Sequence, residues 1–368
     1  MNENENCYVL ALKLTSGIGD VLAKQLISYC GSAAAIFSEK KGALLKIPNI
    51  GDKTIKALIS SSYLKEAERI IQNCEKHQVA VVPYFHADFP VRLKSVNDAP
   101  LLIYTKGKTN FPNSKTIGIV GTRKATNYGK HMTDKIVEEL VAHDAVVISG
   151  LAYGIDIAAH RAALKQGLPT VAVLAGGLDK IYPSVHKKSA LEMLDSEGGW
   201  ISEYPPGTKP EAHNFPSRNR IIAGVAEALI VVEAADKGGA LITANIAYSY
   251  NREVFAVPGD LDNKFSKGCN GLIRAQKANI YTSLKDLEYL LGWEKGETKP
   301  SKQIVDLSAY GESERKIMVV LEEFKSGLHL DELSWKTQIS VNEAVSHLLT
   351  LEFDGLIKSL PGKRYVRI

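Results

Sequence analysis

The fold class that the sequence predicts is α/β, with a doubly wound, mostly parallel sheet in the middle of the chain. Short, continuous apolar runs alternate with helical patterns in this part; they are TIGIVG, AVVISG, TVAVLAG, WISEY, ALIVVEAA and EVFAVPG. Uninterrupted apolar runs of this length are typical of strands that helices cover on both faces. Glycine-rich loops follow several of the runs, which is where a strand of such a sheet turns into a helix.

The composition describes an ordinary globular chain. It has 368 residues, 45% hydrophobic and 23% charged, with a formal net charge of +4. This length allows two or three domains with their own cores, and the charge is too small to indicate a nucleic-acid partner by itself.

The spacing of the cysteines and the length of the apolar runs argue against a zinc protein, a disulfide-rich protein and a membrane protein. Cys7, Cys30, Cys74 and Cys269 lie far apart with no C-x-x-C pair, so we expect neither a zinc site nor a disulfide scaffold. The N-terminus lacks a basic region followed by a long apolar core, and no run approaches the ~18 residues that cross a bilayer. The sequence therefore predicts a cytoplasmic protein with no membrane partner.

The first domain is predicted to be helical and to span residues 1–78. It holds a weak repeat, SGIGDVLAKQL from Ser16 and NIGDKTIKAL from Asn49. The pattern resembles a tandem helix-hairpin-helix, in which glycines let backbone N–H groups approach a DNA phosphate. The alternative is a small helical domain whose glycines only permit tight turns and which docks on its neighbour. From Val79, strand-like segments punctuated by prolines begin the second domain, 79–295.

The C-terminal part is predicted to be a polar linker, 296–311, and a winged helix, 312–368. The order is helix, helix, helix and a hairpin that turns at Pro361 and Gly362. The third helix, from Val341 to Phe353, offers only His347 as a possible cation, which gives little support to base reading in a major groove. A role in protein contact is as well supported. Three basic residues on the expected wing leave a phosphate contact open: Lys363, Arg364 and Arg367.

The stretch HNFPSRNRIIAG carries the strongest functional signal. It sets Phe215, Arg218 and Arg220 at the start of a predicted helix, and residues 212–226 contain no Asp or Glu. The positive N-terminal end of the helix is thereby reinforced, which suits a phosphate chain. Two further windows, 99–133 and 263–285, also lack acids, and together they indicate a groove for a polyanion. The alternative is that both arginines only solubilise the surface and that Phe215 fills a core.

The loop after the first parallel strand is a second candidate. In TIGIVGTRKATNYGK the chain leaves the strand and presents Gly121, Thr122 and Arg123 at the carboxyl end of the sheet, where such folds bind ligands. The glycine spacing is not G-x-G-x-x-G, and Lys124 is misplaced for a Walker loop. We therefore expect no nicotinamide cofactor and no ATP, and no cofactor or metal overall.

A later glycine loop and several acidic residues are candidates for catalysis. In EAADKGGALITANIA, Gly239 opens a helix, Thr243 can hydrogen-bond an oxyanion, and Glu233 can act as a general base or orient Arg218 or Arg220. Asp156 and His160 lie four apart on one helix, as a catalytic pair or, more commonly, a surface hydrogen bond. With no triad and no defensible pair of carboxylates, the sequence favours a binding role.

The chain resembles the DNA processing protein A family of bacterial natural transformation. The resemblance runs through IGIVGTRKAT, SGLAYGIDIAAHRAAL, AVLAGGLDKIYP, SEYPPGTKP, FPSRNRIIAG, VVEAADKGGALITA and VFAVPGDL, and covers residues 79 to 292. It implies an extended Rossmann-like core, a helical domain of helix-hairpin-helix or SAM-like type before it, and a winged helix after it.

The same resemblance implies a dimer that binds single-stranded DNA and loads the RecA recombinase on it, beside or in place of single-strand binding protein, with no catalytic step. By matching motifs, the implied DNA contacts are Gly121, Thr122, Arg123, Lys187, Lys209, Phe215, Arg218, Asn219 and Arg220. Together with Gly239 and Thr243 they form the predicted site.

Two other functions remain open. A phosphoribohydrolase that cleaves nucleotides on a related fold would carry Pro-Gly-Gly-x-Gly-Thr and a glutamate, whereas residues 236–240 read Asp-Lys-Gly-Gly-Ala. An adaptor that assembles mainly through the winged helix would lose its function, but not its DNA affinity, without residues 300–368.

Overall fold

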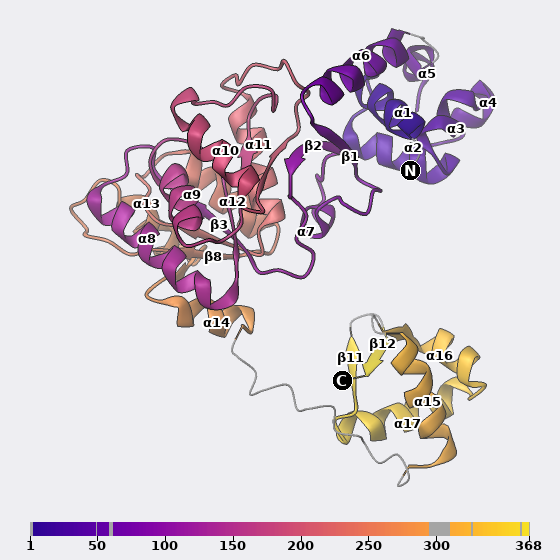
Figure 1. The fold of residues 1–368 in the computed structure, drawn as a ribbon. Helices are drawn as coiled ribbons and strands as arrows, with labels where there is room; N and C mark the ends of the chain where they lie inside the picture. Colours follow the sequence, from indigo (N-terminus) through magenta and orange to yellow (C-terminus); the bar gives the residue numbers. More distant parts are fainter. Residues whose placement is uncertain are drawn as a thin grey trace. The chain divides into compact units, whose positions relative to one another are not determined.

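The computed structural model divides the chain into two compact units, Met1–Glu294 and Lys295–Ile368. It describes residues 3–48, 50–58, 62–293, 310–324, 327–360 and 363–367. Each unit has its own core and is described separately below (Figure 1). The predicted linker 296–311 and the turn at Pro361 and Gly362 lie wholly or mostly outside the described residues, so the predicted domain boundaries stay a prediction.

The first unit begins with helices that pack on one edge of the sheet. They are α1 (Glu3–Leu14), α2 (Asp20–Cys30), α3 (Ala33–Ser38), α4 (Lys41–Leu44), α5 (Asp52–Leu58) and α6 (Ser62–Lys76). Their apolar side chains share one cluster with residues of the neighbouring sheet edge, among them Leu102 and Trp200. The predicted helical region is confirmed, and its core is continuous with that of the α/β part.

Nine strands form a single mixed sheet. They are β1 (Ala80–Pro83), β2 (Leu102–Gly107), β3 (Thr116–Val120), β4 (Val146–Ser149), β5 (Thr170–Leu174), β6 (Gly199–Ser202), β7 (Ala228–Val231), β8 (Glu253–Ala256) and β9 (Asn279–Ile280). Their order is β1-β2-β6-β5-β4-β3-β7-β8-β9, parallel from β6 to β9, with β1 and β2 added antiparallel at one edge. The predicted doubly wound, mostly parallel sheet is confirmed.

Helices cover both faces of this sheet, which explains the uninterrupted apolar strands. On one face α8 (Asn127–Leu140), α9 (Ile155–Lys165) and α14 (Leu284–Leu291) pack on Ile117 and Ile119 of β3. On the other face α11 (Asn214–Val225), α12 (Gly239–Ser249) and α13 (Lys267–Arg274) pack on Val120 and Val231. Strands β3, β4, β5, β6 and β7 are buried along their whole length.

The chain direction locates the functional edge. From β3 the chain moves outward through β4 and β5 to β6, and then returns to place β7 on the other side of β3. The loops that follow β3 and β7 therefore diverge to opposite faces, and such a switch point at the carboxyl ends of the strands is where open α/β sheets bind ligands. Figure 1 shows α8 and α9 beside β3, and the N-terminal helices near β1.

The second unit is a winged helix. It consists of α15 (Glu312–Glu323), β10 (Leu328–His329), α16 (Leu330–Thr337), α17 (Val341–Phe353), β11 (Ile357–Leu360) and β12 (Arg364–Arg367). The three predicted helices and the closing antiparallel strands are present. The sequence did not reveal β10, a strand of only two residues that pairs with β12.

Candidate nucleic-acid interface

Two adjoining hollows lie at the carboxyl edge of the parallel sheet. The first encloses about 500 Å³ between the loops that follow β4 and β5, and the second about 840 Å³ between the loops that follow β3 and β7. Both are lined by Arg123, Ala152, Phe215 and Arg218, so one set of side chains forms the ridge between them.

Phe215 is held in a cationic frame on the first turn of α11. The guanidinium carbon of Arg123 lies 5.2 Å from the centre of its ring, and that of Arg218 lies 5.8 Å from it. The ring of Tyr182 is 6.3 Å away, tilted by 59°. Phe215 remains partly exposed, so the part of its ring that the two cations leave open can stack on a planar group.

Asn214 explains why Phe215 stands at this edge. The Asn214 side chain is buried, and its Nδ2 donates to the carbonyls of Ala175 at 3.0 Å and Lys209 at 3.3 Å. These bonds fix the start of α11 against the loop after β5. The next residue, Phe215, is thereby directed to the ridge between the hollows.

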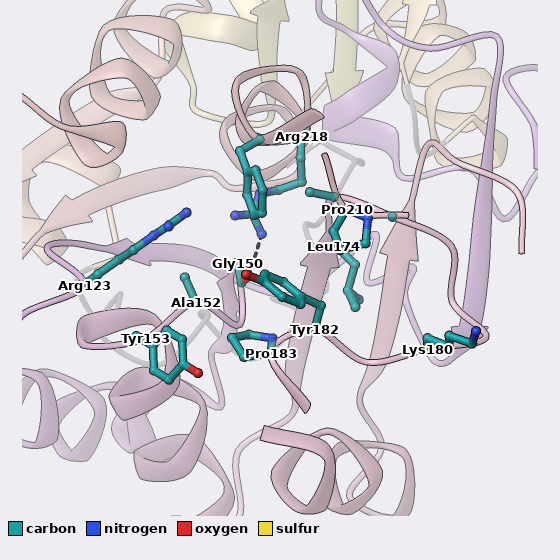
Figure 2. A pocket seen from close by; sticks show the side chains of 13 residues that line it. Arg123, Gly150, Ala152, Tyr153, Leu174, Lys180, Tyr182, Pro183, Pro210 and Arg218 are labelled. Carbon is teal, nitrogen blue, oxygen red and sulfur yellow. Dashed lines mark hydrogen bonds between the residues drawn. The ribbon is translucent and has the colours of Figure 1, made fainter. Parts of the chain in front are cut away.

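Arg218 is buried, and its side chain links α11 to neighbouring backbone carbonyls. Its side chain is 5% exposed, Nη1 donates to the carbonyls of Gly150 and Val173, and Nε donates to Asn219 Oδ1 at 3.1 Å. Figure 2 shows Arg218 reaching the Gly150 carbonyl, with Arg123 pointing toward it from one side. Nη1 and Nε are thus engaged, and among the described residues no hydrogen bond of Nη2 is found.

Burial and charge act together on Arg218. Burial lowers the pKa of Arg218 to about 10, against the opposing effect of Asp156, so the guanidinium stays charged at neutral pH. Burial also raises the pKa of Asp156, while Arg218 and backbone N–H bonds from Ala152, Gly121 and Gly150 oppose that rise. Arg218 thus joins α11 to the ends of β4 and β5 and partly compensates the Asp156 carboxylate.

The loop after β3 presents Arg123 to solvent. Thr122 N donates to the Glu233 carbonyl at 2.7 Å, and Ile155 N donates to the Thr122 carbonyl at 3.2 Å, which tie the loop to the neighbouring segments. A Cβ at Gly121 would come within 2.5 Å of the Ile155 side chain, so only glycine allows this close approach. Arg123 is exposed and, among the described residues, forms no ion pair.

The second hollow is closed by the N-terminal end of α12. Gly238 and Gly239 are exposed there, and the first turn carries no acid, so the positive end of the helix faces the hollow. Thr243 lines the hollow but is buried, and its hydroxyl donates to the Gly239 carbonyl at 3.1 Å. Asn219 Nδ2 donates weakly to the same carbonyl at 3.4 Å, which links α11 to α12.

Arg220 lies away from both hollows. Its Nη2 is 2.6 Å from Glu203 Oε1 and 3.9 Å from Asp20 Oδ2, and Nη1 donates to the Asp98 carbonyl. The side chain is 16% exposed, so its charge is neutralised where the N-terminal helices meet the α/β part. The structure therefore gives the predicted DNA contact of Arg220 no support. The absence of acids in residues 212–226 could not reveal this neutralisation of Arg220, because the carboxylates belong to segments outside that window.

Lys187 and Lys209 are exposed but line neither hollow; Lys187 is the first residue of α10 (Lys187–Asp195). The first hollow is lined instead by three residues that the predicted site omits: Tyr153, Lys180 and Tyr182. Figure 2 shows Tyr182 and Pro183 below Arg218, with Lys180 at one side. Their sequence positions could have indicated this, since all three residues stand in glycine loops that follow predicted strands.

The candidate acid–base groups are structural. Glu233 accepts from Thr126 N at 2.9 Å and Oγ1 at 2.5 Å, beside the start of α8, so the interpretation that it orients Arg218 or Arg220 is wrong. His160 Nδ1 lies 2.7 Å from Thr170 Oγ1 in the core, and burial lowers its pKa to about 3. No hydrogen bond joins His160 to Asp156 within the described part of the chain.

In the N-terminal repeat, Gly17 has a φ of +84°, but Gly19 and Gly51 are not in tight places. A Cβ at Gly19 or Gly51 would meet no atom within 4 Å. The helices that follow begin with Asp20 and Asp52, which form ion pairs with Lys13 at 3.1 Å and Lys41 at 2.7 Å. A carboxylate at the helix start disfavours a phosphate there, so the geometry favours the alternative of a helical domain docked on its neighbour.

Two candidate cations of the winged helix have carboxylate partners, while Lys363 on the wing is exposed. His347 Nδ1 lies 2.7 Å from Glu314 Oε1, and Arg367 Nη1 lies 2.7 Å from Glu322 Oε2. The outer face of α17 instead exposes apolar side chains, namely Val341, Val345, Leu349 and Phe353. Over the ranges that the structure describes, no cluster of three or more His, Cys, Asp or Glu side chains could hold a metal ion, and no helix is long and apolar enough to cross a membrane.

Comparisons with known proteins decide the family. A profile described as "DNA recombination-mediator protein A" matches residues 80–291, and one described as "DprA winged helix domain" matches residues 313–363. The chain belongs to the DprA family. Protein Smf of Synechocystis is 32% identical over 402 residues, covering 100% of both chains, and DNA processing protein DprA of Bacillus subtilis is 39% identical over 60% of this chain and 73% of its own length.

Solved structures of DprA proteins share the fold. The crystal structure of DprA from Streptococcus pneumoniae aligns with a TM-score of 0.62 and 30% identity, over 77% of this chain and 97% of that one. DprA from Helicobacter pylori aligns with a TM-score of 0.52 and 28% identity, over 59% of this chain and 96% of that one, in a study of its single-stranded DNA binding mode. The sequence-based resemblance to this family is thereby confirmed.

Proposed function

We propose that this DprA-family protein binds single-stranded DNA at the ridge between the two hollows, and that it acts as a recombination mediator that loads the RecA recombinase during DNA uptake. The observation that carries the proposal is Phe215, which is partly exposed and has the guanidinium carbons of Arg123 and Arg218 at 5.2 Å and 5.8 Å from its ring centre. The description of the family as recombination mediators and the DNA binding of the Helicobacter pylori relative support it.

The site suits an unpaired strand for physical reasons. A base stacked on Phe215 contributes about 1–3 kcal/mol whatever its identity, since every base has a π face. Arg123, Arg218 Nη2 and the start of α12 offer positive charge and N–H donors to the phosphates. In a duplex the bases are already stacked and paired, so reaching the ring would require them to open.

The finer parts of the proposal rest on family membership. We include RecA as partner, single-strand binding protein as a possible co-partner, a homodimer as the working form, and a cytoplasmic location. We also propose that the protein has no enzymatic step. The competing phosphoribohydrolase function is disfavoured because Glu233 is bound to Thr126 beneath the loop. Free base released from nucleoside monophosphates would establish that alternative.

Titration with a labelled oligonucleotide tests the site. Arg123→Ala should weaken binding of single-stranded DNA about tenfold, because it removes a charge-assisted contact, and should lower the slope of log affinity against log salt by about 0.7. Arg274→Ala is the matched control, since Arg274 is exposed at the end of α13 and lines neither hollow. Equal affinities of the two variants at moderate salt would reject the proposed site.

A RecA assay tests the mediator role separately. On an oligonucleotide coated with single-strand binding protein, the intact chain should shorten the lag before RecA hydrolyses ATP, and Arg123→Ala should restore much of the lag. Tight DNA binding without any effect on RecA would leave the binding site intact and remove the mediator role.

A further inference from the structure

A third hollow lies between the N-terminal helices and the α/β part, outside the site described above. It is an open trough of about 1120 Å³. One wall is α6, and the other is the loop that joins β6 to α11. The lining residues are Glu66, Arg69, Ile70, Gln72, Asn73 and Lys76 on α6, and Pro205, Pro206, Gly207 and Thr208 on the loop.

The loop is a thin partition between this trough and the first hollow. On the trough side, Asn73 Nδ2 donates to the Pro206 carbonyl at 3.0 Å. On the other side, Gly177 N donates to the Thr208 carbonyl at 3.0 Å, within the segment after β5 that lines the first hollow. Thr208 lines the trough and Pro210 lines the first hollow. These two residues are only two positions apart in the chain, so their Cα atoms are at most about 7 Å apart.

Unpaired cations mark the passage from one hollow to the other. Lys180 lines the first hollow, Lys209 stands between Thr208 and Pro210, and Lys76 lines the trough. In the described part of the chain none of these three lysines forms an ion pair. In the loop itself, Asp179 Oδ1 accepts a hydrogen bond from Gly207 N at 2.7 Å.

The trough itself suits a phosphate backbone better than bases. Arg69 is 2.8 Å from Glu66, but the pair is exposed, and such a pair exchanges readily for a phosphate. Gln72 and Asn73 add amide donors, and no aromatic side chain is among the described residues that line the trough. The chemistry therefore fits the sugar-phosphate chain of a strand whose bases face solvent.

We propose that the trough between α6 and residues 205–208 carries the backbone of the same DNA strand beyond the first hollow, so that the N-terminal helices extend the DNA footprint. This inference rests on the proposed function, because the strand must first occupy the ridge at Phe215. Lys76 and Arg69 contact phosphates, and Lys180 and Lys209 guide the strand across the partition.

The test compares lysine variants of one helix across a series of oligothymidylates of increasing length. Lys76→Glu should weaken binding of the longer oligonucleotides by roughly three- to tenfold and leave the shortest ones that bind unaffected, because only long strands reach the trough. Lys65→Glu is the matched control, since Lys65 is exposed on α6 but does not line the trough. Thermal unfolding of both variants establishes that they remain folded.

The outcomes separate this inference from the function on which it rests. If Lys76→Glu and Lys65→Glu bind every length alike while Arg123→Ala is impaired, the ridge binds DNA and the trough does not. If Lys76→Glu weakens the shortest oligonucleotides as much as the longest, the strand does not follow the proposed path. If the unmodified chain binds no oligonucleotide, the proposed function itself fails.

Discussion

Phe215, which is partly exposed, and Phe353 stand on two different surfaces of the molecule, and these surfaces differ in what surrounds the ring. Phe215 stands among two guanidinium groups, the start of α12 and glycine loops. Phe353 is 84% exposed on α17, in a row of apolar side chains, and among the described residues no cation lies over its ring. Only the first surface can neutralise phosphates while a base stacks. An exposed aromatic residue therefore indicates nucleic-acid binding only together with unpaired cations.

The largest effect that we expect is a loss of folding stability when Arg218, beside Phe215, is replaced. Arg218→Ala should lower the free energy of unfolding of the first unit by about 3 kcal/mol, since it leaves the Gly150 and Val173 carbonyls without their donor and Asp156 without its partial compensation. Urea unfolding followed by tryptophan fluorescence measures it. Arg274→Ala should unfold like the unmodified chain. If Arg218→Ala kept its full stability but lost DNA binding, Arg218 would be a DNA-contacting residue and not a structural one.

The second effect compares the two phenylalanines directly. Phe215→Ala should weaken binding of single-stranded DNA by about 2 kcal/mol with little change in the salt slope, because stacking releases no counterions. Phe353→Ala should leave affinity and slope unchanged. Fluorescence anisotropy at several salt concentrations measures both. A comparable loss in both variants would mean that the winged helix also contacts the strand and would break the comparison.

The third and smallest effect is the loss of folding stability at acidic pH that the buried His160 causes. Burial lowers the pKa of His160 from 6.5 to about 3, so the folded state holds it neutral while the unfolded chain protonates it below pH 6.5. The stability present above pH 6.5 is lost as the pH falls toward 3, by about 1 kcal/mol near pH 6. Asp156, whose pKa burial raises, acts in the opposite direction.

His160→Gln tests that effect, because it removes the titrating group and should flatten the loss of stability between about pH 7 and pH 6. The winged helix provides an internal reference, since its exposed Trp335 reports a separate unit from Trp200 and Trp293. An unchanged pH profile in His160→Gln would assign the acid sensitivity to another group.

The sequence predicted the sheet and the ridge because both depend on local patterns. Uninterrupted apolar runs indicated the parallel strands, and a basic window without acids indicated the start of α11. The prolines that punctuate residues 83–112 indicated where the second domain begins but not the pairing of β1 and β2, whose antiparallel place at the sheet edge depends on the distant strand β6.

The roles of the two arginines of α11 could not be predicted in the same way. Arg218 and Arg220 are two positions apart and chemically identical, but their carbonyl and carboxylate partners come from distant segments: the residue after β4, strand β5, residue 98, the loop after β6 and α2. Only the fold brings these partners together. Lys180 and Tyr182 were missed for the same reason, since a position in a loop does not show which way a side chain faces.

Competition between single-stranded and double-stranded DNA of the same sequence for the intact chain tests the central claim most directly. The structure predicts that the single strand is bound at least tenfold more tightly at moderate salt, and that Phe215→Ala removes most of this preference. Equal affinity for both forms, or a preference that survives Phe215→Ala, would contradict the account of an unpaired strand held at the ridge.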